Sequence, residues 1–292
     1  MRTPEFATEV RVSQAGTRGP ELTDKRPGAL RLISVGDSMT LALQVAEEQT
    51  FQARIAAALS TPSRPVEVVN GGVDNHGTQA STRQARRLVE ELDGDGILLT
   101  FFLGNDLVDN QRRPTRGGTL PRQPTVSPLA RVSFLWTYVE VLRAARRAAA
   151  DPGATSRYRA ELSAFTAAGP SAEALRSTRK ALRELGELGE ELGVPVWVAL
   201  APPAFAVHVE RAPATMALAE LDEAVLDLGG PGRAVAAEVP DGVEVVDLGP
   251  PLLAAADAPL YFTFDGHWTP AGHQVVGQAL ADFLEPRLPP SE

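Results

Sequence analysis

The stretch LISVGDSMTLAL, residues 32 to 43, leads a short apolar segment directly into Gly36, Asp37 and Ser38 and then into residues that favour a helix. The apolar segment from Leu30 to Val35 is partly β-branched and ends at a glycine, which is typical of a strand buried on both faces of a parallel sheet. Ser38 therefore stands where a strand ends and a helix begins. At such a turn its hydroxyl points outward, and its backbone N–H belongs to the unpaired donors of a helix start.

The alternation of short apolar segments and helical patterns continues along the chain. Further apolar segments predict strands at 66 to 70, 97 to 103, 194 to 200 and 243 to 248. Helical patterns are found at 51 to 59, 78 to 92, 171 to 192 and from Pro270 onward. Five strands separated by helices predict an open, mostly parallel sheet with helices on both faces.

The domain organisation follows from the same pattern. We expect a single domain at residues 29 to 288, preceded by a polar, extended arm at residues 1 to 28. Residues 107 to 192, between the third and fourth strands, are too many for one crossover and predict a loop and helical insertion. Its helices, at 129 to 150 and 171 to 192, could cover a site, although aromatic residues at helical spacing usually pack on a core. The insertion is therefore interpreted as core and partial lid.

Composition and charge exclude several classes of function. The 292 residues include 28 basic and 37 acidic side chains, a formal net charge of −9, which opposes nucleic-acid binding because that binding depends on clustered lysine and arginine. No cysteine is present, so disulfides and thiolate metal sites are excluded. No apolar run reaches the length of about 18 residues that spans a bilayer. The N-terminus lacks the apolar region of a signal peptide, but a chain whose leader had been removed would look the same, so cytoplasmic and secreted locations both stay open.

Polar residues follow the first three strands at the points where those strands end. They are Gly36-Asp37-Ser38, the loop from Asn70 to Thr78, and Gly104-Asn105-Asp106. Because open parallel sheets bind ligands beyond the carboxyl ends of their strands, we expect these residues on one rim. A serine hydroxyl at neutral pH needs a base to take its proton before it can act as a nucleophile. Without such a base, a Ser or Asp at this place is a helix cap.

The base must come from one of four histidines, His76, His208, His267 and His273. His267 lies two residues after Asp265 and just before the last helix, where Thr269 is the expected cap. A carboxylate so close in sequence can accept the imidazole N–H and stabilise the imidazolium. His208 and His273 have structural alternatives, and His76 could line a pocket.

Four motifs in this order resemble the SGNH, or GDSL-like, hydrolase superfamily of esterases and lipases. They are GDS at 36 to 38, the Asn70 to Thr78 loop, Gly-Asn-Asp at 104 to 106 and Asp-Gly-His-Trp at 265 to 268, within residues 31 to 283. The resemblance implies a three-layer α/β/α, flavodoxin-like domain. It also implies that Ser38 attacks an ester carbonyl, that His267 acts as general base and then acid, and that Asp265 orients His267. The backbone N–H of Ser38, a second-block N–H and the Asn105 side chain would form the oxyanion hole.

Three positions depart from the pattern of the superfamily. Asn75 stands where the second motif usually has Gly, so the oxyanion donor would be the Asn75 backbone N–H, and Asn tolerates positive φ better than most residues. Leu103 replaces the first Gly of Gly-x-Asn-Asp, which affects turn geometry more than chemistry. The last motif is Asp-x-His rather than Asp-x-x-His, a spacing known among related acetyl-transfer enzymes.

The resemblance implies a serine esterase that hydrolyses a small acyl ester, such as an acetylated carbohydrate or a lipid ester, through an acyl-enzyme. The same site could serve an O-acyltransferase that moves an acetyl group to a sugar hydroxyl, or the chain could be a catalytically silent binding relative. Asp37, His76, Asp106 and Trp268 are further candidates to line the substrate pocket. The sequence has no HExxH, P-loop or GxGxxG motif. We therefore expect no metal and no cofactor, and a small-molecule ester as partner, with the oligomeric state left open.

Overall fold

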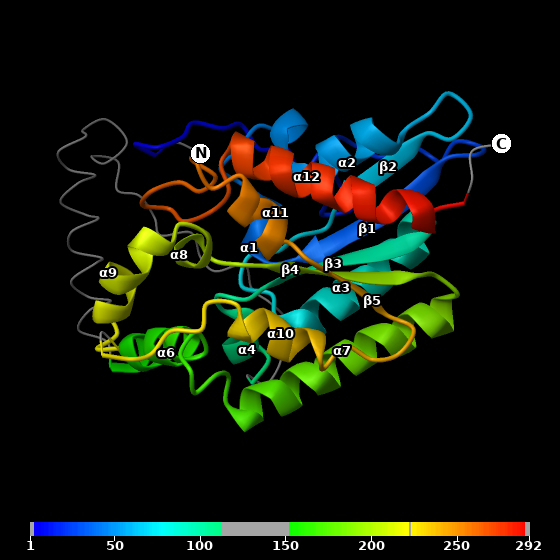
Figure 1. Cartoon of the computed structure of the whole chain (residues 1–292). Helices are drawn as coiled ribbons and strands as arrows, with labels where there is room; N and C mark the ends of the chain where they lie inside the picture. Colours follow the sequence, from blue (N-terminus) through cyan, green and yellow to red (C-terminus); the bar gives the residue numbers. More distant parts are fainter. Residues whose placement is uncertain (1–2, 112–151, 222, 290–292) are drawn as a thin grey trace.

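Five parallel strands form a central sheet in the computed structural model of the protein, which describes residues 3–111, 152–221 and 223–289. The strand order is β2-β1-β3-β4-β5, and each neighbouring pair is parallel (Figure 1). The strands are β1 (Leu30–Gly36), β2 (Val66–Asn70), β3 (Gly96–Phe102), β4 (Val196–Ala201) and β5 (Glu244–Asp247). This order is that of flavodoxin-like, doubly wound sheets, so the predicted fold is confirmed.

The middle strands are buried on both faces because helices cover the sheet from both sides. The sequence VWVALA of β4 is buried at every position, and in LRLISVG of β1 only the first residue is partly exposed. Such near-continuous apolar runs are typical of parallel strands. The register sets Gly36 beside Thr100, so β1 and β3 end at the same edge of the sheet.

One face of the sheet is covered by α2 (Phe51–Leu59), α11 (Gly249–Ala254) and α12 (Pro270–Leu284) (Figure 1). The core on this face includes Leu32, Phe51, Trp197, Trp268 and Val276. α2 and α12 lie against each other, and a Cβ added at Gly277 would approach Arg54 Cβ to 2.4 Å. The missing side chain at Gly277 therefore permits the close approach of the two helices.

The opposite face is covered by α3 (Thr78–Leu92), α7 (Ala172–Leu192) and α10 (Gly230–Ala236) (Figure 1). The core here includes Ile33, Leu99, Phe101 and Leu185. Ser171 caps α7 by accepting a hydrogen bond from the backbone N–H of Ala174 at 3.2 Å. The buried residues of α7 recur every three or four positions, the spacing of one apolar stripe. The two helical layers and the sheet give the three layers that the resemblance implied.

The described residues also form five further helices and three 3-10 turns. They are α1 (Ser38–Leu41), α4 (Asp106–Asp109), α6 (Pro152–Ser163), α8 (Ala204–Val207) and α9 (Ala212–Ala217), with 3-10 turns at Glu47–Gln49, Val209–Arg211 and Glu285–Arg287. α6 and α7 lie between β3 and β4, and α7 is also the helix that packs next to α3. The expected helix at 129 to 150, and the loop before it from residue 112, lie outside the described residues.

The N-terminal segment crosses the surface between the sheet edge and α1. Arg18 forms an antiparallel bridge with Asn70 at the end of β2. The Arg18 guanidinium donates to the backbone carbonyls of Leu41 at 2.8 Å and Val45 at 2.6 Å, and also to that of Ala42. These bonds fasten the segment to the chain that follows α1.

Candidate active site

Three side chains from distant parts of the sequence form a hydrogen-bonded chain at the carboxyl edge of the sheet. Ser38 Oγ lies 2.8 Å from Nε2 of His267, and Nδ1 of His267 lies 2.7 Å from Oδ1 of Asp265. All three residues are partly buried. An imidazole held in this way can take a proton from the hydroxyl while the carboxylate stabilises the imidazolium.

Ser38 is placed by the sharp exit of the chain from β1. Gly36 has a φ of +152°, and a Cβ there would lie 2.3 Å from Thr40 Oγ1 and 2.7 Å from the Thr100 carbonyl oxygen. Asp37 is the N-cap of α1, and its Oδ1 accepts a hydrogen bond from the Met39 N–H at 2.9 Å. The glycine and the cap together fix Ser38 as the first residue of the helix.

His267 and Asp265 lie on a tight loop that ends in α12. Tyr261 and Trp268 form an antiparallel bridge, and the Phe262 N–H donates to the His267 carbonyl at 2.8 Å. Gly266, between the two functional residues, has a φ of +81°, a conformation that favours glycine. This turn brings the carboxylate to the ring of the residue two positions later, so the short Asp-x-His spacing is compatible with the contact.

The pKa values of this pair move in opposite directions. Burial opposes the ionisation of Asp265, but the hydrogen bonds and positive charge of His267 outweigh it and hold the pKa of Asp265 below its usual value. Burial likewise opposes protonation of His267, but the hydrogen bond and charge of Asp265, together with the charge of Asp37, raise the pKa of His267. The two residues therefore stabilise each other's charged forms.

A hydrogen bond to Asp37 orients the side-chain amide of Asn105. Its Nδ2 donates to Oδ2 of Asp37 at 3.3 Å, and within the described residues its buried Oδ1 has no hydrogen-bond partner. Burial raises the pKa of Asp37 to about 6, against the opposing effects of the Met39 N–H, His267 and Asn105. The amide of Asn105 thus lies on the same rim as Ser38, as predicted from the ends of β1 and β3.

Asp37 and Asp106 do not line an open pocket, which corrects our expectation for both. Asp37 is 0% exposed and Asp106 is 2% exposed. Oδ2 of Asp106 accepts from the Phe102 N–H at 2.8 Å, and burial and the negative charge of Asp37 raise the pKa of Asp106 well above its usual value. Both carboxyl groups lie beneath the rim and hold its backbone.

Asn75 and His76 lie on the loop between β2 and α3. Asn75 is exposed and has a φ of +60°, the left-handed conformation that a glycine adopts easily. Its Nδ2 donates to Oδ2 of Asp74 at 2.9 Å. His76 is half-buried, and burial, followed by the nearby charge of Arg83, lowers its pKa. Among the described residues, neither the Asn75 nor the His76 side chain forms a hydrogen bond with Ser38 or His267.

The C-terminal half of the sequence is similar to a known protein family. A family model described as "SGNH hydrolase-like domain, acetyltransferase AlgX" matches residues 153–292. This segment holds Asp265 and His267, and Gly36, Asp37 and Ser38 precede it at the end of β1 in the flavodoxin-like sheet. Residues 153–292 are therefore similar to an SGNH hydrolase-like domain.

Solved structures with a similar overall arrangement include three whose names describe hydrolases. LAE5, an alpha/beta hydrolase enzyme from the metagenome of Lake Arreo, Spain, is 15% identical over 88% of this chain and 96% of its own, with a TM-score of 0.47. A catalytic mutant of Axe2, an acetylxylan esterase from Geobacillus stearothermophilus, is 15% identical over 87% and 92%, with a TM-score of 0.47. The lipase/acylhydrolase from Enterococcus faecalis is 15% identical over 90% and 99%, with a TM-score of 0.43. A comparison of the sequence with curated proteins found no match.

Trp268 belongs to the core, which corrects our expectation that it lines the pocket. It is 0% exposed, and its ring packs edge-on against Phe51 with centroids 6.0 Å apart. Among the other histidines, His273 is buried and its Nδ1 accepts a hydrogen bond from the Phe51 N–H at 3.2 Å. His273 thus has the structural role expected of it, at the start of α2.

Sequence reasoning missed two residues that contact the Asp265 loop. A hydrogen bond from the buried side chain of Gln44 helps to lower the pKa of Asp265. Glu5 binds the backbone of the same loop. Glu5 lies in a polar arm with no helical or strand periodicity, so no pattern in the sequence pointed to it.

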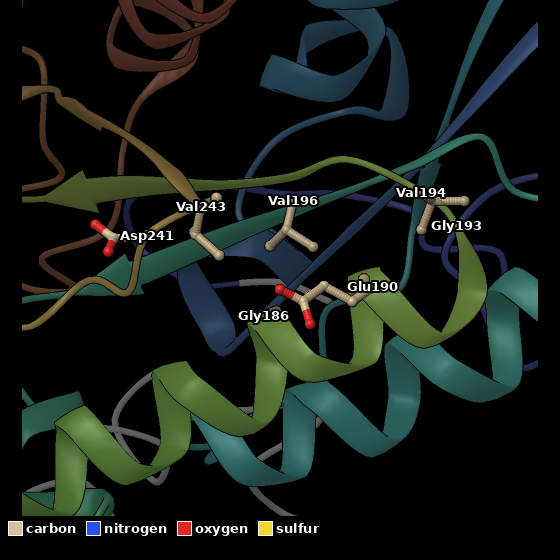
Figure 2. Close-up of a pocket in the computed structure, with 9 residues that line it drawn as sticks. Gly186, Glu190, Gly193, Val194, Val196, Asp241 and Val243 are labelled. Carbon is tan, nitrogen blue, oxygen red and sulfur yellow. The ribbon is translucent and has the colours of Figure 1, made fainter.

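A hollow elsewhere on the surface is separate from this site. It lies between α7 and the chain around β4 and β5, and Figure 2 shows Gly186 and Glu190 on the helix opposite Val196 and Val243. Val196 begins β4, so the hollow is toward the amino end of that strand and away from Ser38. Over the described ranges, no three His, Asp or Glu side chains are grouped so that they could hold a metal ion. In the same part of the chain, no helix combines the length and apolar character needed to cross a membrane.

Proposed function

We propose that this chain is a serine esterase that cleaves a small acyl ester through an acyl-enzyme at Ser38. The observation that supports the proposal is the chain of hydrogen bonds from Ser38 through His267 to Asp265, at 2.8 and 2.7 Å. A lone serine at a helix start would need none of these partners. An imidazole within bonding distance supplies the base that converts the hydroxyl into a nucleophile.

In the first proposed step, Ser38 attacks the ester. Its Oγ forms a bond to the carbonyl carbon while the hydroxyl proton moves to Nε2 of His267. The imidazolium is stabilised by Asp265, which accepts the Nδ1–H. The tetrahedral intermediate then collapses, the bond to the alcohol oxygen breaks, and His267 returns the proton to that oxygen. The products of this half-reaction are the free alcohol and an acyl ester on Ser38.

The negative oxygen of the tetrahedral intermediate requires hydrogen-bond donors. We assign this role to the backbone N–H groups of Ser38 and Asn75 and to Nδ2 of Asn105. The hydrogen bond to Asp37 supports the assignment, because it fixes the Asn105 amide before the substrate arrives. One preorganised donor of this kind contributes on the order of 3 kcal/mol to the stability of the transition state.

The second proposed step releases the acyl group. Water gives a proton to His267 and attacks the acyl carbon, and the Ser38 ester bond breaks as His267 returns the proton to Oγ. The enzyme regains its starting state and a carboxylic acid is released. The same carbon could accept a sugar hydroxyl in place of water, because only the incoming oxygen differs.

Acetyl transfer to a sugar hydroxyl is therefore the second candidate function. The observation that favours it is the match of residues 153–292 to the family described as acetyltransferase AlgX. The Asp-Gly-His-Trp spacing at 265 to 268 points the same way. Both candidates share the acyl-enzyme and differ in the acceptor that reaches it.

The acyl-enzyme is tested with p-nitrophenyl acetate and a fluorophosphonate probe. We expect hydrolysis and probe labelling by the native protein, and a loss of hydrolysis by at least about 10⁴-fold with loss of labelling in Ser38→Ala. Ser63→Ala, at an exposed serine far from the rim, is the matched control and should behave as the native protein. Equal rates for the native protein and Ser38→Ala would refute the proposal, and absence of labelling at Ser38 would favour a silent binding relative.

Hydrolysis and transfer are separated by product analysis. The native protein is incubated with p-nitrophenyl acetate, with and without a neutral oligosaccharide, and the sugar is analysed by mass spectrometry. An esterase gives acetate at the same rate in both reactions. A transferase gives an acetylated sugar at the expense of acetate.

A further inference from the structure

One carboxylate of the N-terminal arm binds three successive backbone N–H groups of the loop that carries Asp265. Oε1 of Glu5 accepts from Thr263 N at 2.7 Å and from Phe264 N at 3.1 Å. Oε2 accepts from Phe264 N at 3.2 Å and from Asp265 N at 2.8 Å. Hydrogen bonds to an ionised acceptor are roughly twice as strong as those between neutral groups.

The residues next to Glu5 hold the arm in place. The ring of Phe6 is 8% exposed and packs on Phe262, with ring centroids 5.3 Å apart. Thr8 Oγ1 donates to the Leu43 carbonyl at 2.6 Å, close to the end of α1. The arm therefore connects the segment that follows Ser38 with the loop that carries Asp265 and His267 (Figure 1).

Within the loop from 262 to 267, the Asp265 carboxylate bonds the backbone N–H and Nδ1 of His267, at 3.4 and 2.7 Å, but no internal bond holds the backbone N–H groups of Thr263, Phe264 and Asp265 among the described residues. The Phe262 N–H donates to the His267 carbonyl, and the Gly266 N–H donates to the Phe262 carbonyl at 3.2 Å. Thr263 and Phe264 are exposed, and the Phe264 side chain is 89% exposed. Packing therefore contributes little to the position of Thr263, Phe264 and the Asp265 backbone, whereas the Glu5 carboxylate binds all three of these residues.

We propose that Glu5 is a positioning residue of the active site, which fixes the Asp265 backbone so that its carboxylate meets Nδ1 of His267. Glu5 acts through Asp265 and does not contact the reacting atoms. The inference rests on the proposed function, since it concerns the alignment of the same general base. When Glu5 is removed, the loop gains freedom and the Asp265 to His267 contact is populated for a smaller fraction of the time.

The titration of His267 reports this alignment without any substrate. Two charged groups raise the pKa of His267: Asp265 on its own loop and Asp37 at the end of β1. His273 on α12 is also close enough to interact with the charge of His267. Loosening of Asp265 removes the largest effect that favours protonation, while burial continues to oppose it. The pKa of His267 must then fall.

The experiment compares Glu5→Ala, Glu5→Gln and the control Glu9→Ala. Glu9 lies in the same arm and is exposed, and its one ion pair among the described residues is a 4.0 Å contact with Arg11. We expect Glu5→Ala to increase amide hydrogen exchange at residues 263 to 265 by at least about tenfold. It should also lower the pKa of His267 measured by NMR. Labelling of Ser38 by the fluorophosphonate should become slower by at least about tenfold. Glu5→Gln, which keeps one acceptor oxygen, should be intermediate in all three, and Glu9→Ala should match the native protein.

The three measurements separate a positioning role of Glu5 from a purely structural one. Faster exchange with an unchanged His267 pKa and labelling rate in both Glu5 variants would show that Glu5 only stabilises the loop, which overturns it. Unchanged exchange at the three amides would overturn it as well. If the native protein neither labels nor hydrolyses esters, but exchange and the His267 pKa change as expected, the proposed function fails while the positioning role stands. If Glu5→Ala does not fold, Glu5→Gln supplies the same three measurements.

Discussion

Nε2 of His267 lies 2.8 Å from Ser38 Oγ, although 229 positions separate the two residues in the sequence. The contact depends on α1 and α12, which contribute Met39 and Val276 to the same core cluster. Ser38 begins α1 after β1, and His267 immediately precedes Trp268 and the start of α12. Because Trp268 packs edge-on against Phe51 of α2, the core on this face determines where His267 lies.

Truncation of Trp268 should therefore lower stability as well as activity. We expect Trp268→Ala to reduce the free energy of unfolding by about 3 to 5 kcal/mol, the cost of removing a large buried aromatic side chain. The measurement is urea denaturation, with the slope of the transition as a check on two-state behaviour. Trp268→Phe should lose less because it retains most of the buried ring.

Phe264→Ala is the control for Trp268→Ala. Phe264 is an aromatic residue of the same loop that is 89% exposed, so its removal should change the free energy of unfolding by less than about 0.5 kcal/mol. Equal losses for the two variants would contradict the assignment of Trp268 to the core.

Asp265→Asn should change the pH dependence of ester hydrolysis. In the native protein Asp265 raises the pKa of His267, and only the neutral imidazole accepts the Ser38 proton. The acid limb of kcat/KM should therefore lie above the ordinary histidine value of about 6.5. In Asp265→Asn the stabilising charge is lost and burial still opposes protonation, so the limb should move to lower pH.

The same substitution should also reduce the rate at every pH. An Asn at this position can favour the wrong imidazole tautomer, and losses of about 10⁴-fold in kcat accompany that change in serine enzymes with this arrangement. The measurement is a kcat/KM profile from pH 5 to about 9. An acid limb that stays where it is in the native protein would show that Asp265 does not set the protonation of His267.

The strand pattern was enough to predict the sheet and the rim. Ser38 and Asn105 each follow an apolar segment of one strand, so parallel strands place them at one edge, and the structure shows both there. The site of His267 could be inferred only from its neighbour Asp265 and its place before a helix. The contact between these two residues depends on the φ of +81° at Gly266, and periodicity carries no information on a single backbone angle.

Side-chain direction and long-range contacts explain what the sequence analysis missed. Trp268 and His267 are adjacent in sequence, yet one ring points into the core and the other to Ser38. Glu5 meets its partners across 258 to 260 positions of sequence. No local propensity predicts such a contact, because it depends on the path of an arm without regular secondary structure.

Removal of the Asn105 amide should lower catalysis with little effect on substrate binding. We expect Asn105→Ala to reduce kcat by about 10² to 10³-fold, with KM changed by a small factor, because the donor acts mainly on the developing oxyanion. Asn105→Asp has nearly the same shape but places an acceptor and a negative charge beside the oxyanion. Its loss should be at least as large.

The assignment of Asn105 has a clear opposing result. If Asn105→Ala raises KM and leaves kcat unchanged, the side chain binds the substrate in its ground state. Thermal denaturation of both variants, compared with the native protein, separates a loss of the donor from a loss of fold. A rate that stays within a few-fold of the native value in a folded Asn105→Ala would remove the residue from the proposed oxyanion hole.

His273 should make the folded state sensitive to acid, and its replacement should reduce that sensitivity. Burial, with the nearby positive charges of Arg18, His267 and Arg54, lowers the pKa of His273 from its ordinary value of 6.5 to about 3. As the pH falls below 6.5 the unfolded chain binds a proton at this residue, but the folded chain does so only near pH 3. The contribution of His273 to the free energy of unfolding is therefore complete above pH 6.5 and is lost progressively toward pH 3, with a slope of up to about 1.4 kcal/mol per pH unit.

His273→Asn keeps an acceptor for the Phe51 N–H and removes the titration. We expect urea denaturation between pH 7 and 4 to show a smaller loss of stability in His273→Asn than in the native protein. Because other buried groups such as Asp37 titrate equally in both proteins, the difference between the two curves isolates His273, and parallel curves would show that its pKa is not lowered by folding.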